Sequence, residues 1–369
     1  MNIGLLGFGV VGKGVYDILR EREDMHLVKI LCRRPLELPD TQIVKDYMQI
    51  VEDPSIDTVV EAIGGIHPAF EMVSAALAAG KNVVTPNKAL ICTYYRELLA
   101  LAQEHGVYLR CTAAVGGGIG WLSEVERARR VQSFSQVGGI MNGTCNYILD
   151  NMTRKGLDYT DVLRQAQDLG YAEADPSTDV DGIDTWHKTI LSSNIAWGVA
   201  VDKHSVPVAG ISRITAADVE NFKAHGRVCK LLGTGKKENG VYSIYVQPTL
   251  VKDGELEAAV PMNYNLVSFH GEISGPMSFY GQGAGRYPTA YNVVQDLCDV
   301  QSGRGFYALC GETVTAENSE EYTYYVRGNW TGPVAETWGD ALITQPISVK
   351  AMHQWRKENP DAFIAAIRQ

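Results

Sequence analysis

The first 115 residues alternate short apolar runs with amphipathic stretches. The apolar runs lie at 3–6, 27–31, 58–63, 82–85 and 107–111. The stretches between them, at 10–19, 68–80 and 93–105, have apolar residues at helical spacing. The second stretch ends at Gly80, and Gly106 follows the third. Strands that alternate with helices in this way predict an α/β domain with a Rossmann-type, doubly wound parallel sheet over residues 1–115.

After residue 115 the pattern changes to groups of helices and groups of strands. Helices are predicted at 121–130, 144–154, 159–168 and 183–197, and strands at 134–141, 242–246, 266–270 and 277–280. This order predicts a second, α+β domain over residues 116–284. Residues 285–301 are predicted to form a further helix, and 302–369 a short C-terminal extension with a strand at 322–327 and a short helix around 362–367.

Composition narrows the function classes. The 369 residues carry a formal net charge of −10 and no Lys/Arg run, which argues against nucleic-acid binding. No stretch of 18 apolar residues and no signal-peptide pattern occur, so we expect a cytoplasmic protein without a membrane span. Seven Cys without a C-x-x-C motif and eight His without H-x-x-x-H spacing indicate reduced thiols and no metal site.

The first strand is followed by a glycine motif, Gly7-Phe8-Gly9-Val10-Val11-Gly12. G-x-G-x-x-G alone is common, but here it follows an apolar strand and opens a helix. The glycines then allow a tight turn, the approach of backbone N–H groups to a pyrophosphate, and close packing of helix on strand. The motif predicts a dinucleotide site; the alternative is only a tight turn.

The end of the second strand indicates which dinucleotide binds. NAD sites have an Asp or Glu there to accept from the ribose 2′-OH, whereas this chain has Arg33 and Arg34. Two guanidinium groups suit a 2′-phosphate, so we predict NADP. NAD remains an alternative, because some such enzymes accept both cofactors and these arginines could simply be solvated.

Seven further segments resemble the homoserine dehydrogenase family, over about residues 1–300. They are 64–65, 84–89, 115–119, 142–148, 170–176, 179–188 and 281–290. The resemblance implies NAD(P)-dependent interconversion of L-homoserine and L-aspartate 4-semialdehyde, on the route to threonine and methionine. It implies a homodimer or homotetramer formed through the second domain, with 285–301 returning to the first. It also assigns Gly64, Gly65, Lys88, Gly170, Gly283 and Gly285 to the cofactor.

Aldehyde reduction needs a proton donor and groups that hold the substrate's amino-acid end. By resemblance, Lys188 is the proton donor and Lys88 lies beside the nicotinamide. Glu173 and Asp184 match the acids that bind homoserine, and Asn142, Gly143 and Thr144 line the same pocket. Asp184 and Lys188 are also spaced i, i+4, which on a helix gives one face; a solvated salt bridge would show the same spacing.

Two departures from the family pattern stand out. Thr112 occupies the position where the family often has a glutamate that binds a monovalent cation, so we expect no firmly bound metal. The extension 302–369 is too short for a complete regulatory ACT domain and is either a degenerate remnant or a dimer-stabilising extension. A related amino-aldehyde oxidoreductase and a non-catalytic NADP sensor remain as alternative functions.

Overall fold

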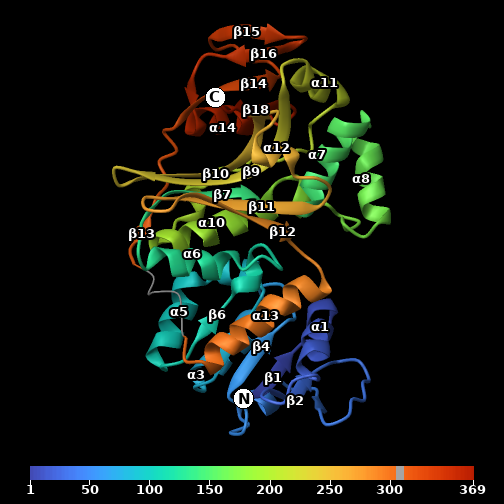
Figure 1. Cartoon of the computed structure of the whole chain (residues 1–369), viewed down its shortest axis with the longest axis vertical. Helices are drawn as coiled ribbons and strands as arrows, with labels where there is room; N and C mark the ends of the chain where they lie inside the picture. The colour runs from blue at the N-terminus through green and yellow to red at the C-terminus, as the bar shows by residue number, and fades with distance from the viewer. Residues whose placement is uncertain (305–310) are drawn as a thin grey trace. The chain divides into compact units, whose positions relative to one another are not determined.

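The computed structural model describes residues 1–304 and 311–369, which form two compact units (Figure 1). The first comprises Met1–Val131, Trp197–Ala200 and Gln282–Glu312, and the second comprises Gln132–Ala196, Val201–Gly281 and Thr313–Gln369. Among the helices that the structure describes, none combines the length and the apolar character that a membrane crossing requires.

The first unit is built on a six-stranded sheet in the order β3-β2-β1-β4-β5-β6, and every pairing is parallel. Its strands are β1 (Asn2–Leu6), β2 (His26–Leu31), β3 (Gln42–Val44), β4 (Thr58–Glu61), β5 (Asn82–Val84) and β6 (Leu109–Arg110). The strand order reverses between β1 and β4, the place where open α/β sheets bind ligands. The predicted Rossmann-type sheet is confirmed.

Helices cover this sheet, and one of them comes from late in the chain. They are α1 (Val10–Leu19), α2 (Met48–Val51), α3 (Ala69–Ala78), α4 (Lys88–Thr93), α5 (Tyr95–Glu104), α6 (Trp121–Arg129) and α13 (Arg286–Gln301). Gly14 of α1 faces α13 so closely that a Cβ atom there would lie 2.8 Å from the Arg286 carbonyl oxygen. Val293 and Leu297 of α13 join Ile3 in the core. The helix predicted over 285–301 therefore packs in the first unit.

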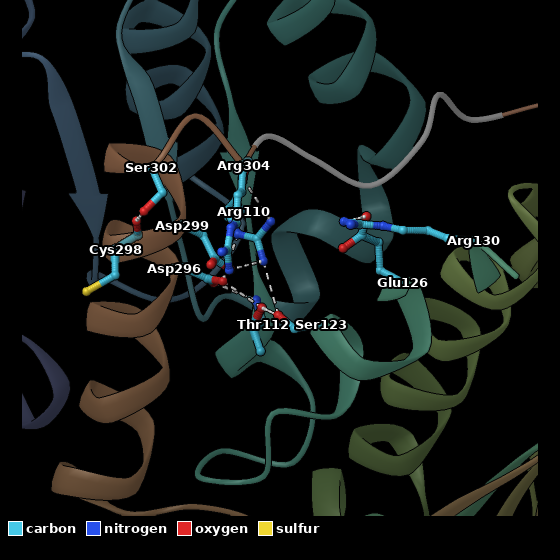
Figure 2. A network of polar contacts seen from close by, with 10 residues as sticks. All are labelled: Arg110, Thr112, Ser123, Glu126, Arg130, Asp296, Cys298, Asp299, Ser302 and Arg304. Atoms are coloured by element: carbon cyan, nitrogen blue, oxygen red, sulfur yellow. Dashed lines mark hydrogen bonds and ion pairs between the residues drawn. The ribbon is translucent and has the colours of Figure 1, made fainter. Parts of the chain in front are cut away.

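A buried polar network joins α13 to the end of β6 and to α6 (Figure 2). Arg110 Nε donates to Asp296 Oδ1 at 2.9 Å, and Arg110 Nη2 lies 2.8 Å from Asp299 Oδ2. The Thr112 amide donates to Asp296 at 2.8 Å, and the Thr112 hydroxyl lies 2.6 Å from the Ser123 hydroxyl. Burial raises the pKa of Asp296, and the neighbouring Arg110 opposes this. These contacts hold α6 and α13 against the end of β6 within the first unit.

The second unit contains a mixed sheet in the order β12-β11-β7-β9-β10-β18-β14-β16-β15. Its longer strands are β7 (Phe134–Ile140), β9 (Arg227–Glu238), β10 (Val241–Lys252), β11 (Tyr264–Gly271) and β12 (Gly275–Gln282). Its helices are α7 (Gly143–Lys155), α8 (Tyr159–Asp168), α9 (Ser177–Val180), α10 (Ile183–Trp197), α11 (Ala216–Ala224), α12 (Leu256–Ala259) and α14 (Val349–Glu358). Helix α10 lies directly on the sheet, since a Cβ at Gly233 would be 2.0 Å from the Thr189 hydroxyl. The predicted α+β character is confirmed.

The C-terminal segment extends this sheet and corrects one prediction. It contributes β14 (Glu321–Arg327), β15 (Val334–Trp338), β16 (Ala341–Thr344), β17 (Ile347–Ser348) and β18 (Phe363–Ile367). The short helix predicted around 362–367 is wrong, because these residues form β18, which pairs with β10 and β14. A short apolar run fits a buried helix or a central strand equally well, and pairing on both edges selects the strand.

Candidate active site

The glycine motif after β1 forms the turn into α1. Gly7 has φ +100°, and a Cβ at Gly12 would lie 2.3 Å from the Gly7 carbonyl oxygen. By contrast, a Cβ at Gly9, the residue that caps α1, would have no atom of the described residues within 4 Å apart from its chain neighbours and the backbone of its own helix. Gly7 and Gly12 thus allow the turn itself, while Gly9 leaves space in front of the helix N-terminus. That space and the positive end of the helix dipole fit a dinucleotide pyrophosphate.

The predicted 2′-phosphate ligands follow β2. Arg33 and Arg34 are both exposed. Lys45, which follows β3, donates from its Nζ to the carbonyl oxygens of Cys32, Arg33 and Arg34 at 2.7, 3.0 and 3.2 Å. Lys45 therefore shapes the turn that presents the arginines and adds a third positive charge there. Sequence reasoning missed this residue, because nothing in its spacing indicates that β3 lies next to β2.

The next loops along the same sheet edge carry Gly64, Gly65 and Lys88. Both glycines have positive φ angles, +80° and +73°, which other residues rarely adopt. Lys88 is the first residue of α4, and Asn87 caps that helix with its side-chain oxygen accepting from the Leu90 amide at 3.2 Å. These segments thus lie at the carboxyl ends of β4 and β5, at one edge of the sheet.

The other predicted glycines have separate structural roles. Gly170 has φ +74° and follows the end of α8. Gly285 caps α13 with φ +124°. Gly283 lies against Gly117, where a Cβ would come within 2.6 Å of the Gly283 carbonyl. Their assignment to the cofactor stays a prediction.

In the second unit, Lys188 and Asp184 meet on α10 and are both buried, with 7% and 5% of their surface exposed. The Lys188 Nζ lies 2.8 Å from Asp184 Oδ2 and donates to the Met141 carbonyl oxygen at 2.7 Å. A solvated surface salt bridge, the alternative interpretation of their spacing, is therefore wrong. Burial makes such a pair costly unless further bonds satisfy it, and such charges are typical of functional sites.

Asn142 connects this pair to a second carboxylate. Its amide nitrogen donates to Asp184 Oδ2 at 2.8 Å and to Asp179 Oδ1 at 2.7 Å. Its amide oxygen accepts from the Cys145 backbone at 2.8 Å and so caps α7. The Asn142 side chain therefore couples the beginning of α7 to two acids that follow it by dozens of residues.

Gly143 and Thr144 lie at the same helix terminus. A Cβ at Gly143 would be 2.7 Å from the Asn263 carbonyl oxygen, so only glycine fits there. The Thr144 hydroxyl donates to the Tyr171 carbonyl oxygen at 2.7 Å. The structure thus brings Asn142, Gly143 and Thr144 together at the first turn of α7.

Burial raises the pKa of two titratable groups close to Lys188. Burial raises the pKa of Asp179, the bond from Asn142 opposes this, and the nearby charge of Asp184 adds to it. Burial also raises the pKa of the Cys145 thiol well above its usual value, which keeps this thiol protonated and unreactive. An additional positive charge near Asp179 would favour its ionised form.

Glu173 is the predicted site residue that does not join this cluster. It is exposed, and its carboxylate bonds to no residue in the part of the chain that the structure describes. Asp179 takes the place beside Asn142 instead. Five acids lie between 173 and 184, and their spacing alone could not show which of them faces the start of α7.

The Thr112 side chain, at the position where the family often has a cation-binding glutamate, is held by hydrogen bonds to other side chains. The Thr112 hydroxyl donates to Asp296 Oδ1 at 2.6 Å and contacts Ser123. Over residues 1–304 and 311–369, no three His, Cys, Asp or Glu side chains are grouped to hold a metal ion. The expectation of no bound metal stays a prediction.

Comparisons with known proteins agree with this architecture. Residues 121–298 match the model of the homoserine dehydrogenase family, and residues 7–112 match the homoserine dehydrogenase NAD binding domain. Homoserine dehydrogenases of Bacillus subtilis and Pseudomonas aeruginosa are 38% and 39% identical, each over 81% of this chain and 72% of the relative. The crystal structure of a homoserine dehydrogenase from Thiobacillus denitrificans is similar with a TM-score of 0.89 and 31% identity, over 100% of this chain and 98% of that one.

Proposed function

The chain belongs to the homoserine dehydrogenase family, and on that premise we propose which residues carry out its reaction and which cofactor it prefers. This NAD(P)-dependent oxidoreductase interconverts L-homoserine and L-aspartate 4-semialdehyde, with Lys188 as the proton donor and NADP as the preferred cofactor. The observation that carries the proposal is the buried Lys188 ammonium, fixed by Asp184 and the Met141 carbonyl.

The nicotinamide cofactor, when bound, supplies the hydride acceptor or donor, so the protein's tasks are positioning and proton transfer. Two N–H groups of Lys188 are engaged, and no third acceptor is present for it among the described residues. We assign the third N–H to the aldehyde oxygen of the substrate. There the ammonium stabilises the developing negative charge and delivers the proton. Asp184 keeps Lys188 in place, and Asn142 keeps Asp184 in place.

The amino-acid end of the substrate needs anions for its ammonium group. We assign this role to Asp184 and Glu173, as the resemblance implies, and add Asp179, whose carboxylate is held by Asn142. Asn142, Gly143 and Thr144 line the same site. A substrate ammonium beside Asp179 would offset the cost of burying this carboxylate.

The residues of the first unit fit the cofactor. We propose that Gly7, Phe8, Gly9, Val10, Val11 and Gly12 hold the pyrophosphate, because the structure leaves space at Gly9 in front of α1. Arg33 and Arg34, presented by Lys45, bind the 2′-phosphate. Gly64, Gly65, Lys88, Gly170, Gly283 and Gly285 complete the cofactor site, with Lys88 beside the nicotinamide.

The proposal also covers the oligomeric state of the chain and its location in the cell. The chain forms a homodimer or homotetramer and acts in the cytoplasm on the route to threonine and methionine. Size-exclusion chromatography with light scattering would measure the mass of the assembly.

The test is a steady-state assay that follows the absorbance of NADPH with L-aspartate 4-semialdehyde. We expect rapid oxidation of NADPH and slower turnover with NADH at equal concentrations. Faster turnover with another amino aldehyde would favour the related oxidoreductase. Binding of NADPH without turnover of any of these aldehydes would favour the sensor.

A further inference from the structure

Glu61 is a fully buried acid that none of the roles above uses. It is the last residue of β4 and has 0% of its surface exposed. Its Oε1 accepts from the backbone amides of Ile63 and Gly64 at 2.7 and 3.0 Å, and its Oε2 accepts from the Thr85 hydroxyl at 2.6 Å. A carboxylate is an acceptor-only group, so three donors suit its ionised form.

The Thr85 hydroxyl links Glu61 to the next loop through hydrogen bonds. Thr85 follows β5, is fully buried, and donates to Glu61 while it accepts from the Asn87 amide at 2.9 Å. Its hydroxyl thus uses both its donor and an acceptor site. Replacement by valine, which has the same shape, would remove both bonds.

Asn87 closes the network into a ring. Its Nδ2 donates to the Gly65 carbonyl oxygen at 2.6 Å, and its Oδ1 accepts from the Leu90 amide. The ring therefore runs from Glu61 through the Gly64-Gly65 loop to Asn87, and through Thr85 back to Glu61. It ties together the loops after β4 and β5, and the next residue after Asn87 is Lys88.

The ring lies at a position in the sheet where it can affect the reaction. β4 stands beside β1 at the point where the strand order reverses. In open α/β sheets a dinucleotide binds across the sheet edge at this point. A bound dinucleotide would place one half over the β1 side with the glycine motif and the other half over the loops that the ring holds.

We propose that Glu61 is a positioning residue for hydride transfer. Its carboxylate holds the Gly64-Gly65 loop and the Thr85–Lys88 turn in one arrangement and thereby places the Lys88 ammonium and the nicotinamide. This inference rests on the proposed function, because Lys88 has its role only there. A misplacement of about 1 Å in such a site costs roughly 100-fold in rate.

The test compares Glu61→Gln, Thr85→Val and Thr85→Ser in the full-length enzyme. Glutamine keeps the shape of Glu61 but presents an amide donor to Thr85, and valine at position 85 removes the link. We expect kcat to fall by about tenfold or more in both variants, with the Kd of NADPH changing less than about threefold. Thr85→Ser keeps both bonds and retains a kcat within about twofold of the parent.

A kinetic isotope effect separates positioning from a merely structural role. With NADPH deuterated at the transferred position, Glu61→Gln and Thr85→Val should show a larger isotope effect on kcat than the parent, because hydride transfer becomes slower relative to the other steps. Loss of thermal stability with unchanged kcat and isotope effect in both variants would overturn the proposal.

The outcomes remain distinguishable from those of the proposed function. If Glu61→Gln does not fold, the Thr85→Val and Thr85→Ser pair decides the question. A parent enzyme that fails to turn over L-aspartate 4-semialdehyde refutes the proposed function. A parent that turns it over at the same rate as both ring variants refutes the role of Glu61.

Discussion

The nucleotide-binding edge of the first unit and the polar cluster of the second are built from different parts of the chain. At the nucleotide edge, the glycine turn from Gly7 to Gly12 is backbone, and one short segment supplies it. In the second unit, Lys188, Asp184, Asp179 and Asn142 meet through side chains from α7, α10 and the segment before α10. The glycine turn is therefore local in sequence, whereas the polar cluster is assembled by folding.

This difference indicates which kinds of substitution should impair each site. A backbone site depends on what a Cβ atom would displace, so its sensitive positions are glycines. A side-chain site depends on charge and on bonds between groups far apart in sequence, so its sensitive positions are polar residues. Substitutions that remove charge should therefore impair catalysis at the polar cluster, and substitutions that add volume should impair folding or binding at the glycine turn.

The largest expected effect is at Lys188. Lys188→Met removes the proposed proton donor while it keeps the apolar stem, so kcat should fall by about 1,000-fold, within the range for general acid catalysis. NADPH binding, measured by fluorescence titration, should be retained, because the proposed cofactor residues are elsewhere. Lys155→Met, an exposed lysine at the end of α7, is the control. A near-normal rate for Lys188→Met would remove the assignment.

The second-largest effects are expected for substitutions in the glycine turn. A Cβ at Gly12 would collide with the Gly7 carbonyl, so Gly12→Ala should destabilise the fold by about 2 kcal/mol, as overpacking typically does. In Gly9→Ala the added methyl group would contact none of the described residues beyond its neighbours in the chain, so the melting temperature should stay unchanged. NADPH binding should nevertheless weaken by about tenfold, worth about 1.4 kcal/mol. Equal NADPH affinity in Gly9→Ala and the parent would show that the pyrophosphate does not approach this residue.

Cofactor preference should depend on the arginines after β2. Arg33→Ala should raise the KM for NADP by about tenfold, the equivalent of one charge-assisted hydrogen bond, and leave the KM for NAD nearly unchanged. Arg20→Ala removes another exposed arginine, at the end of α1, and serves as the control. Equal losses with both cofactors would contradict the assignment of the 2′-phosphate site.

The smallest expected effect is a gain in the stability of the folded protein when Asp179 is replaced by asparagine. Burial raises the pKa of Asp179 in the folded state, so the folded protein holds its proton to higher pH than the unfolded chain. Wild-type stability should therefore fall as pH rises from the unfolded-state pKa through the raised one. Asp179→Asn lacks this loss, so its melting temperature should match the parent's at acidic pH and exceed it by about 2 °C at neutral pH. Its KM for homoserine should rise at the same time. A gain that is largest at acidic pH would contradict the burial argument.

Much of the first unit followed from local pattern. Apolar runs between helical stretches predicted its parallel sheet, and G-x-G-x-x-G after a strand predicted the turn into α1. Both depend on neighbours within a few residues, so periodicity and glycine spacing suffice. The i, i+4 spacing of Asp184 and Lys188 likewise predicted a shared helix face.

Tertiary structure alone decided the rest. Only packing placed Lys45 beside Arg33, and only the pairing of β18 with β10 and β14 turned 363–367 into a strand. Burial and the bonds from Asn142 distinguished Asp179 from Glu173, although both lie in one acid-rich segment. The physical reason is common to all these cases. A side chain's partner and its distance from water depend on residues far away in sequence, and their approach is a property of the whole fold.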